Sequence, residues 1–435
     1  MHSQSEEQSL IPADANTKPA VWSLPTRLAF RFSFVYLVLF NFPMSFDFIP
    51  GVTAFSGWYE ELWRKAAIWA GAHVLHLSRP VPYIPIGSDT LAQYIQVPLM
   101  LALALAAMLV WSVLDRQRRE YAWLHQWLRL YARLALGSAL LLYGADKVIK
   151  SQFPDPFLWR LIQPFGDSNP MGLLWTFMGY SRSYNIFTGL LEMAGGALVM
   201  VPRLATLGAF ISLGAMANVF MLNISYDVPV KIYSFHLLVL SAFLLMPELR
   251  RMGSVFILNR PVQPVAAPPL FQRKWLNVGV LGMQLVLLAY WTGSDLHQAH
   301  QRVTQYGDLA PRPPLYGIYS VEEFVVDGQV RPPLFTDEQR WHRFTFDRFN
   351  LMGIQMASGS VQRYHGNPDL TARTLQLSKN GEPGWKASFT LETPSPGEVT
   401  LNGEMDGKKI QARLRKVDFT FALYTDNFHW VAPSQ

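Results

Sequence analysis

Long apolar runs alternate with short polar stretches over the first two-thirds of the chain. A run of about 18 or more apolar residues is long enough to cross the hydrocarbon core of a bilayer as a helix. On this pattern the sequence predicts about seven membrane-spanning helices, the first of them short and rich in aromatic residues. They cover residues 28–43, 95–114, 130–149, 184–201, 204–222, 230–246 and 275–290.

The segments between these runs have characters of their own. Residues 1–26 are rich in Ser, Gln, Glu, Ala and Pro, which predicts a disordered tail. Residues 57–77 have helical periodicity, which predicts an amphipathic helix on the outer face of the membrane. The connection 151–182 is predicted to be partly helical, and the Pro-rich stretch 252–272 to be an extended linker. The apolar side of the amphipathic helix consists of Trp58, Leu62, Trp69 and Val74.

Beyond the last apolar run, the period of the pattern changes to two. From Tyr316 to Trp430, apolar and polar residues alternate in short segments that end at Gly, Asn or Asp. About seven or eight antiparallel strands are expected, and their close spacing predicts a small barrel or sandwich, for example a lipocalin-like barrel. The predicted fold class is therefore a multi-pass α-helical membrane protein with a C-terminal all-β, barrel-like or sandwich domain over residues 295–435.

The basic residues predict the orientation. Lys and Arg number 37 against 31 Asp and Glu, which gives a net charge of +6. With seven spans the basic loops all fall on one side, and that side is the cytoplasm by the positive-inside rule. We expect a bacterial inner membrane protein with a cytoplasmic N-terminus and an extracytoplasmic β-domain. Since membrane topology explains the basic residues, membrane lipid is the expected partner and nucleic acid is not.

The chain contains no cysteine. Disulfides, thiolate metal sites and iron–sulfur clusters held by this chain are therefore excluded. No metal site is predicted, because no other set of ligands has a recognisable spacing.

Ionisable residues are concentrated between about 128 and 251. Tyr143, Lys147 and Lys150 are spaced i, i+4, i+7 and so share one stripe at the predicted outer end of the third span. Asp146 lies four residues before Lys150. Two interpretations fit these lysines. They snorkel to the headgroup level with Asp146 as a local partner, or they form an anion or headgroup site at the mouth of the bundle.

Glu192 lies near the middle of the fourth span, in the segment TGLLEMAGGAL. A carboxylate at this depth is unfavourable unless it is paired, hydrogen-bonded or protonated. The neighbouring glycines let another helix approach closely. Either Glu192 ties two helices together, through a lysine or Asn218, or it is a functional group that carries a proton or hydrogen-bonds a quinone carbonyl.

A further polar group surrounds the predicted outer ends of the fifth and sixth spans, where Asn218, Lys231 and His236 lie. Convergent polar side chains in apolar surroundings mark a binding pocket. The candidate catalytic residues are Glu192, Lys147 and His236, and the candidate cofactor-binding residues are Tyr143, Lys150, Asn218 and Lys231.

The block from 128 to 251 resembles the DoxX family of small four-helix membrane proteins. The resemblance rests on LLYGADKVIK at the end of the first helix, on LLEMAGGALVMVPRLATLGA, and on a final helix with a short charged end. It implies a four-helix bundle in which Lys147 and Glu192 are the family-matching positions. The family name comes from a subunit of a thiosulfate:quinone oxidoreductase, and most members have no established activity. The extra spans and the β-domain depart from the family pattern, and without cysteine this chain cannot carry a persulfide.

With this resemblance the chain divides into five parts. They are the disordered cytoplasmic tail (1–26), two spans with the amphipathic helix (27–127), the four-helix bundle (128–251), the linker with the last span (252–294) and the β-domain (295–435).

Two functions of different classes follow. In the first, the bundle binds a quinone or lipid-like molecule as part of a membrane redox or envelope system; an enzyme of this kind would be a quinone-linked oxidoreductase subunit with a redox or envelope partner protein. In the second, the chain is a non-catalytic envelope scaffold whose β-domain recruits a partner. A transporter is less favoured, because the sequence has no inverted repeat and no paired broken helices.

Overall fold

The computed structural model describes residues 21–43, 52–79, 81–82, 89–263, 269–379, 381–382, 384–425 and 429–431. Residues 1–20 of the predicted tail and residues 264–268 of the predicted linker lie outside these ranges. The chain forms two compact units. The first unit consists of Met1–Ala139, Val199–Ala209 and Pro229–Leu285, and the second of Leu140–Leu198, Phe210–Val228 and Val286–Gln435.

Helices make up the described part of the first unit, and the second unit combines helices with a β-domain. The first unit contains α1 (Leu24–Asn41), α2 (Val52–His73), α3 (Leu91–Leu114), α9 (Lys231–Leu245), the short η3 (Met246–Glu248) and α10 (Leu249–Phe256). The second contains α5 (Leu158–Ile162), η2 (Phe165–Asp167), α6 (Pro170–Tyr180) and α12 (Ala422–Thr425). Residues of both units belong to α4 (Ala122–Val148), α7 (Arg182–Met200), α8 (Ala205–Ser225) and α11 (Lys274–Tyr306).

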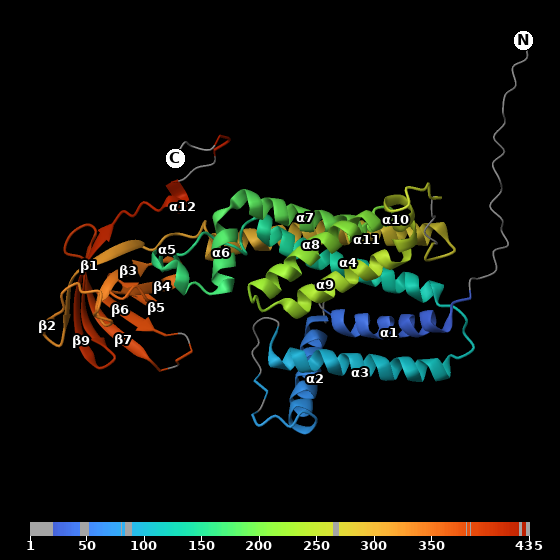
Figure 1. The fold of residues 1–435 in the computed structure, drawn as a ribbon, viewed down its shortest axis with the longest axis horizontal. Coiled ribbons are helices and arrows are strands. Elements are labelled where there is room, and N and C mark those ends of the chain that lie inside the picture. The colour runs from blue at the N-terminus through green and yellow to red at the C-terminus, as the bar shows by residue number, and fades with distance from the viewer. Residues whose placement is uncertain are drawn as a thin grey trace, which may run out of the picture. The chain divides into compact units, whose positions relative to one another are not determined.

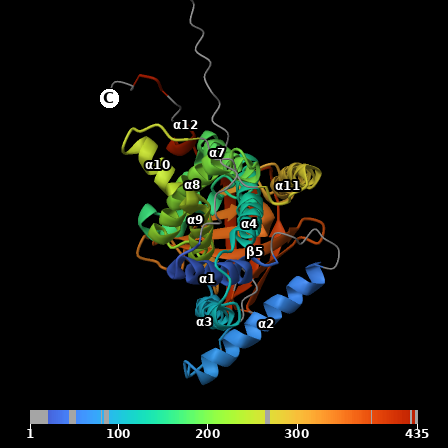
Figure 2. The same cartoon turned by 90° about the vertical axis from the view of Figure 1, so that its right-hand side faces the viewer.

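In the first unit, α1 and α3 run antiparallel and side by side (Figures 1 and 2). Arg31 near the start of α1 donates hydrogen bonds to the hydroxyl of Ser112 near the end of α3 and to the hydroxyl of Tyr121. The helix α2 crosses α3 instead of running beside it, and Ala67 and Ala70 of α2 pack against the beginning of α3. Small residues at this crossing allow the two backbones to approach closely.

Four helical segments in the described part of the chain are long and apolar enough to cross a membrane. They are Leu91–Leu114, Ala205–Ser225, Lys231–Phe256 and Lys274–Tyr306. The other three predicted spans form the helices α1, α4 and α7, which are not among these four segments. Several apolar helices are thus confirmed, whereas seven crossings and their orientation stay predictions.

Three boundaries differ from the prediction. The helix α1 begins at Leu24, inside the predicted tail. Part of the predicted extended linker is helical, because α10 reaches Phe256 before the first proline of the linker, Pro261. The last predicted span continues well past residue 290 to Tyr306. No Gly or Pro occurs between residues 294 and 306, so the change from apolar to polar residues does not end the helix.

The β-domain is a closed antiparallel barrel. The strand order is β2-β1-β3-β4-β5-β6-β7-β8-β9, and β1 also pairs with β9. This second pairing joins the first and last strands, so the barrel alternative is confirmed and the sandwich is wrong. The strands are β1 (Gly317–Val326), the two-residue β2 (Gln329–Val330), β3 (Trp341–Phe346), β4 (Leu351–Met356), β5 (Val361–Asp369), β6 (Thr374–Ser378), β7 (Lys386–Glu392), β8 (Glu398–Met405) and β9 (Lys408–Val417), with η4 (Arg348–Asn350) between β3 and β4.

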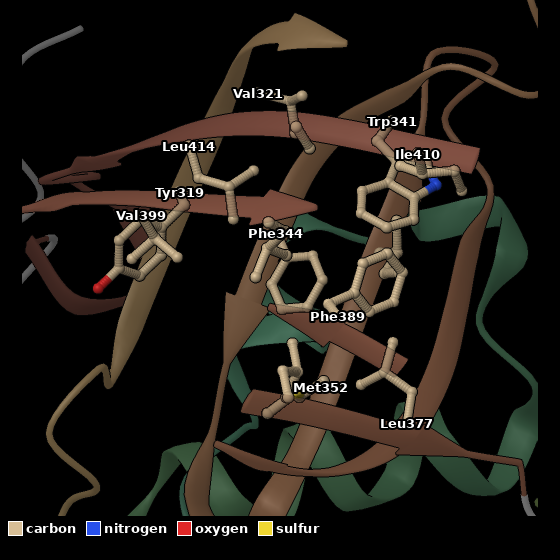
Figure 3. Close-up of a cluster of buried hydrophobic side chains, with 14 of the residues drawn as sticks. Tyr319, Val321, Trp341, Phe344, Met352, Leu377, Phe389, Val399, Ile410 and Leu414 are labelled. Atoms are coloured by element: carbon tan, nitrogen blue, oxygen red, sulfur yellow. The ribbon is translucent and has the colours of Figure 1, made fainter. Parts of the chain in front are cut away.

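Side chains fill the interior of the barrel. Alternation along β7 points Ala387, Phe389 and Leu391 inward. Figure 3 shows Phe389 among inward-facing residues of the other strands, including Trp341 and Phe344. An eight-stranded barrel is just wide enough to be filled by its own side chains, so the interior here is a packed core instead of a ligand cavity.

Candidate functional site

A buried ion pair joins α4 and α7 in the second unit. Lys147 Nζ donates a hydrogen bond to Glu192 Oε2 over 2.8 Å. Lys147 is 7% exposed and Glu192 is 2% exposed. Two glycines bring the helices together here, since a Cβ atom on Gly189 would lie 2.7 Å from the carbonyl oxygen of Gly144. The predicted tie from Glu192 to a lysine is therefore present.

The ring of Tyr143 lies beside the same pair. Lys147 Nζ is 5.7 Å from the centroid of that ring, one turn earlier on α4, which is within cation–π range. The structure thus brings together Tyr143, Lys147 and Glu192. Asn218, the other predicted partner of Glu192, is exposed. The face of α8 that meets α7 carries Ser212, and Asn218 is rotated from that residue by about 120° around the helix.

A second ion pair joins α4 to α11. Arg302 donates a hydrogen bond to Asp146 Oδ1 over 2.5 Å, and the hydroxyl of Ser151 donates to the same oxygen. The predicted local pairing of Asp146 with Lys150 is wrong. The helix ends at Val148 and Lys150 has a φ of 64°, so the i, i+4 geometry is lost at this point.

Asp295 lies two turns before Arg302 on α11 and is 8% exposed. The negative charge of Asp146 disfavours the ionised form of the Asp295 carboxylate, and the positive charge of Arg302 favours it. Asp295 and Arg302 are not among the predicted site residues, because the predicted span ends before them. Their spacing of seven residues was the available signal, since it places both on one face of a continuing helix.

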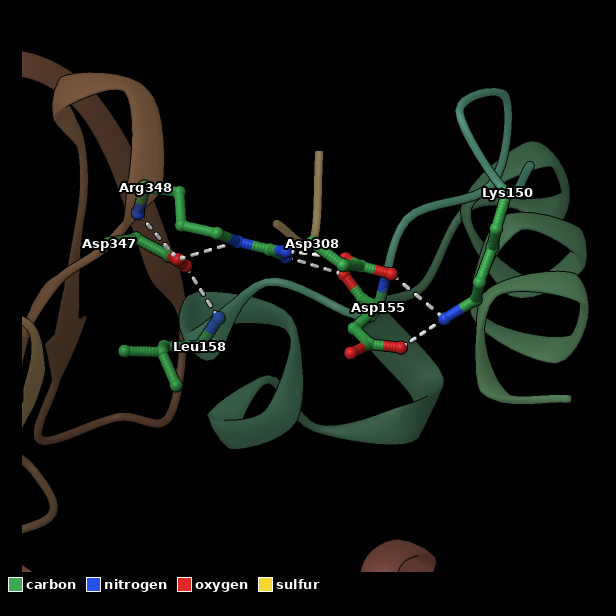
Figure 4. A network of polar contacts seen from close by, with 6 residues as sticks. All are labelled: Lys150, Asp155, Leu158, Asp308, Asp347 and Arg348. Carbon is green, nitrogen blue, oxygen red and sulfur yellow. Dashed lines mark hydrogen bonds and ion pairs between the residues drawn. The ribbon is translucent and has the colours of Figure 1, made fainter. Parts of the chain in front are cut away.

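Lys150 begins a chain of contacts that ends at the barrel (Figure 4). Its ammonium contacts the carboxylate of Asp155 and, over 3.0 Å, that of Asp308. Arg348, at the barrel, donates to Asp308 Oδ1 over 2.6 Å. Asp347 accepts a hydrogen bond from the backbone nitrogen of Leu158. We name the charged members of this chain the ionic junction. They are Lys150, Asp155, Asp308, Asp347 and Arg348.

Opposite effects act on two carboxylates of the ionic junction. Burial tends to raise the pKa of Asp308, but hydrogen bonds from Lys150, Asp155 N and Arg348, together with the charge of Lys150, hold that pKa below its ordinary value. At Asp347 burial outweighs the hydrogen bonds from backbone N–H groups and raises the pKa. Asp308 therefore carries a stabilised negative charge between two cations.

Lys231 and His236 belong to the first unit. The carboxylate of Asp89 accepts hydrogen bonds from the backbone nitrogens of Lys231 and Ile232 over 2.7 and 2.9 Å, and so caps the start of α9. Lys231 Nζ lies 3.8 Å from the same carboxylate. This contact places Lys231 at a helix cap, and a role of Lys231 in ligand binding stays a prediction.

His236 is buried among aromatic rings of α1. Its Nε2 lies 2.6 Å from the hydroxyl of Tyr36, and its Nδ1 lies 2.6 Å from the carbonyl oxygen of Ile232. The imidazole stacks on Phe40 with the ring centroids 3.5 Å apart. Two partners and a stacked ring are typical of a structural histidine, and a catalytic role of His236 stays a prediction. Among the residues that the structure describes, no group of three His, Asp or Glu could hold a metal ion.

Comparison with known proteins adds one relative. No model of a known protein family matches the chain, and no solved structure matches it. Over 124 residues the chain is 32% identical to "Uncharacterized protein YwoB" of Bacillus subtilis (strain 168). The match covers 28% of this chain and 79% of the relative. Because it includes most of that relative, the chain belongs, through this stretch, to the same family as YwoB.

Proposed function

We propose that this chain is an integral membrane protein of DoxX-like type that binds a quinone or lipid-like molecule between its helices, beside Lys147 and Glu192. The observation that carries the proposal is the buried pair itself, in which two opposite charges are held away from water. Desolvating both members of such a pair is unfavourable, and apolar residues often join helices equally well. Ionisable groups inside a membrane bundle are therefore functional candidates by default.

The chemistry of the pair suits a quinone. Lys147 has three N–H donors, and one of them is directed at Glu192. A quinone carbonyl is an acceptor that a further donor can bind. Glu192 would exchange a proton with a ring oxygen held near the ammonium. In a redox system, electrons would come from a partner protein and this chain would be the quinone-binding subunit.

Mass spectrometry of small molecules that co-purify with the chain in mild detergent tests the proposal. We expect a stoichiometric quinone or lipid-like molecule. The double variant Lys147→Met/Glu192→Leu should fold and lose that molecule, because apolar side chains of similar volume replace the pair. Glu248→Gln/Arg251→Met is the control, since this pair lies in the first unit. If both double variants retain the co-purified molecule equally, Lys147 and Glu192 do not form its binding site.

The packed barrel favours a second candidate, a scaffold that recruits a partner. Since side chains fill the interior, only the outer surface of the barrel is available for binding. A photo-crosslinking residue at Ser358, which is exposed on the barrel, would test this in the full chain. Capture of one defined envelope protein from Ser358, and not from the exposed position Gln117 in the turn after α3, would favour the scaffold.

A further inference from the structure

A groove of about 540 Å³ lies where β1 begins and β9 ends, within the second unit. We name it the barrel-edge groove. Its wall includes the start of β1, the end of β9 and the connection around Asp155, and its aromatic residues are Tyr316, Phe419, Phe421 and Tyr424. Ligand sites usually have volumes of roughly 300 to 1,000 Å³, so this groove is large enough for part of an organic molecule.

The barrel-edge groove lies close to the ends of two helices. Asp308 and Arg312 follow α11, which ends the candidate span at Tyr306, and Asp155 follows α4. The six residues from Tyr306 to Arg312 can reach at most about 20 Å when fully extended. If α11 crosses the bilayer, the groove therefore lies on the side of the membrane where α11 ends.

Two cations at the groove have no carboxylate partner within the part of the chain that the structure describes. Arg348 is paired with Asp308. Arg312 and Lys416 are exposed, and neither forms an ion pair with any residue in the described ranges. The guanidinium of Arg312 lies 4.9 Å from the ring centroid of Tyr316. The side chain of Lys416 lies across Gly317, where a Cβ atom would be 2.6 Å from Lys416 Cε. Both cations therefore line the same groove.

We propose that the barrel-edge groove binds the phosphodiester headgroup of a membrane lipid. Arg312 and Lys416 would contact the phosphate, which is the anion that uncompensated Arg and Lys side chains recognise. The exposed carboxylate of Asp418, also in the lining, is an acceptor for a headgroup amine. Phe421 and Tyr424 would lie along the glycerol and the first methylenes, since aromatic rings favour the boundary between polar and apolar regions. This site is separate from Lys147 and Glu192 and does not depend on the proposed function.

Titration of the full chain in mild detergent with a short-chain phosphatidylethanolamine, followed by native mass spectrometry and calorimetry, tests this proposal. Arg312→Gln/Lys416→Gln should weaken binding by about tenfold or more, because both charge-assisted contacts are lost. Arg312→Lys/Lys416→Arg keeps both charges and should bind within about threefold of the unchanged chain. The control Lys386→Gln/Lys409→Gln removes two exposed barrel lysines outside the groove and should leave the affinity unchanged.

Two further arms separate a lipid from a small anion. Inorganic phosphate and glycerophosphoethanolamine should not compete at concentrations that saturate the lipid site. Competition by free phosphate at equal affinity would overturn the lipid assignment. Unchanged affinity in Arg312→Gln/Lys416→Gln, or an equal loss in the control, would overturn the groove as the site.

Discussion

Lys147 and Glu192 are each more than nine-tenths buried, so each is the main compensation for the charge of the other. Removing one partner of a buried pair leaves an uncompensated charge, whereas replacing both with apolar side chains does not. The sequence placed Tyr143 and Lys147 together because both lie on one helix. It left the partner of Glu192 open, because that partner depends on how two helices pack.

The pair predicts an asymmetry between single and double variants. Glu192→Gln should lower the free energy of unfolding by about 3 kcal/mol, whereas Lys147→Met/Glu192→Leu should change it by less than about 1 kcal/mol. Denaturant unfolding in detergent measures both values. If Glu192→Gln leaves the free energy of unfolding unchanged, another group compensates the charge of the Lys147 ammonium.

Gly189 predicts a second effect at this scale. A methyl group there would lie 2.7 Å from the carbonyl oxygen of Gly144 and 2.8 Å from the nitrogen of Val148. Both atoms are backbone and cannot move aside, so Gly189→Ala should separate the helices and cost about 1–3 kcal/mol. Gly214→Ala on α8 is the control, because a Cβ there meets no atom within 4 Å. Thermal unfolding should show a lower melting temperature for Gly189→Ala alone.

At the scale of elements, α2 has a buried side, an exposed apolar side and a charged side. Trp63, Ala67 and Ala70 are buried on one of them. Its exposed large apolar residues fall within about 60° of arc at 3.6 residues per turn. They are Phe55, Trp58, Leu62 and Trp69. A helix with such a stripe, lying across the start of a candidate span, fits the predicted position at the membrane interface.

The absence of cysteine makes this position measurable. A fluorophore attached to Trp58→Cys should be quenched by quenchers on lipid acyl chains, because this side of α2 would enter the bilayer. The same fluorophore at Glu60→Cys should not be quenched, since Glu60 is exposed and lies about 160° from Trp58 around the helix. Equal quenching at both positions would be inconsistent with an interfacial helix.

The ionic junction predicts a pH dependence. Folding lowers the pKa of Asp308, so its charge stabilises the fold above the ordinary pKa of about 4, and this contribution is lost as the pH falls through the lowered value. Asp308→Asn should cost about 2 kcal/mol at pH 7, because charge-assisted hydrogen bonds from Lys150 and Arg348 are lost. Its stability should then decline less steeply than that of the unchanged chain below about pH 4.

Unfolding by denaturant between pH 7 and pH 3 checks both statements. Asp347 acts in the opposite direction, because its raised pKa favours protonation as the pH falls; this contribution is common to both proteins. Parallel stability curves for Asp308→Asn and the unchanged chain would show that Asp308 does not titrate as described.

At the scale of the whole molecule, the predicted topology places the loop after α3 and the barrel on opposite sides of the membrane. Gln117→Cys and Ser358→Cys add single thiols at exposed positions of these two regions. A membrane-impermeant thiol reagent on intact cells should label Ser358→Cys, and should label Gln117→Cys only after lysis, because seven crossings and the positive-inside rule set these sides. Labelling of both thiols in intact cells would require a different number of crossings.

Local periodicity determined most of the elements from the sequence alone. Apolar runs predicted the helices, and period-two alternation predicted the strands, because each pattern reflects which face of one element is buried. The weakest signal came from β5, where Pro368 and several polar residues interrupt the alternation. Apolar periodicity also did not predict where every helix ends, since the continuation of α11 to Tyr306 does not depend on apolar residues.

Tertiary structure alone decided the closure of the barrel and the ion pairs. The pairing of β1 with β9, and the contacts of Asp308 with Lys150 and Arg348, join residues far apart in the chain. Such contacts arise from the packing of complete elements, and neither composition nor spacing within one element encodes which distant charge will face which. For this reason the sequence supplied the charged residues of the site, and only the fold selected their partners.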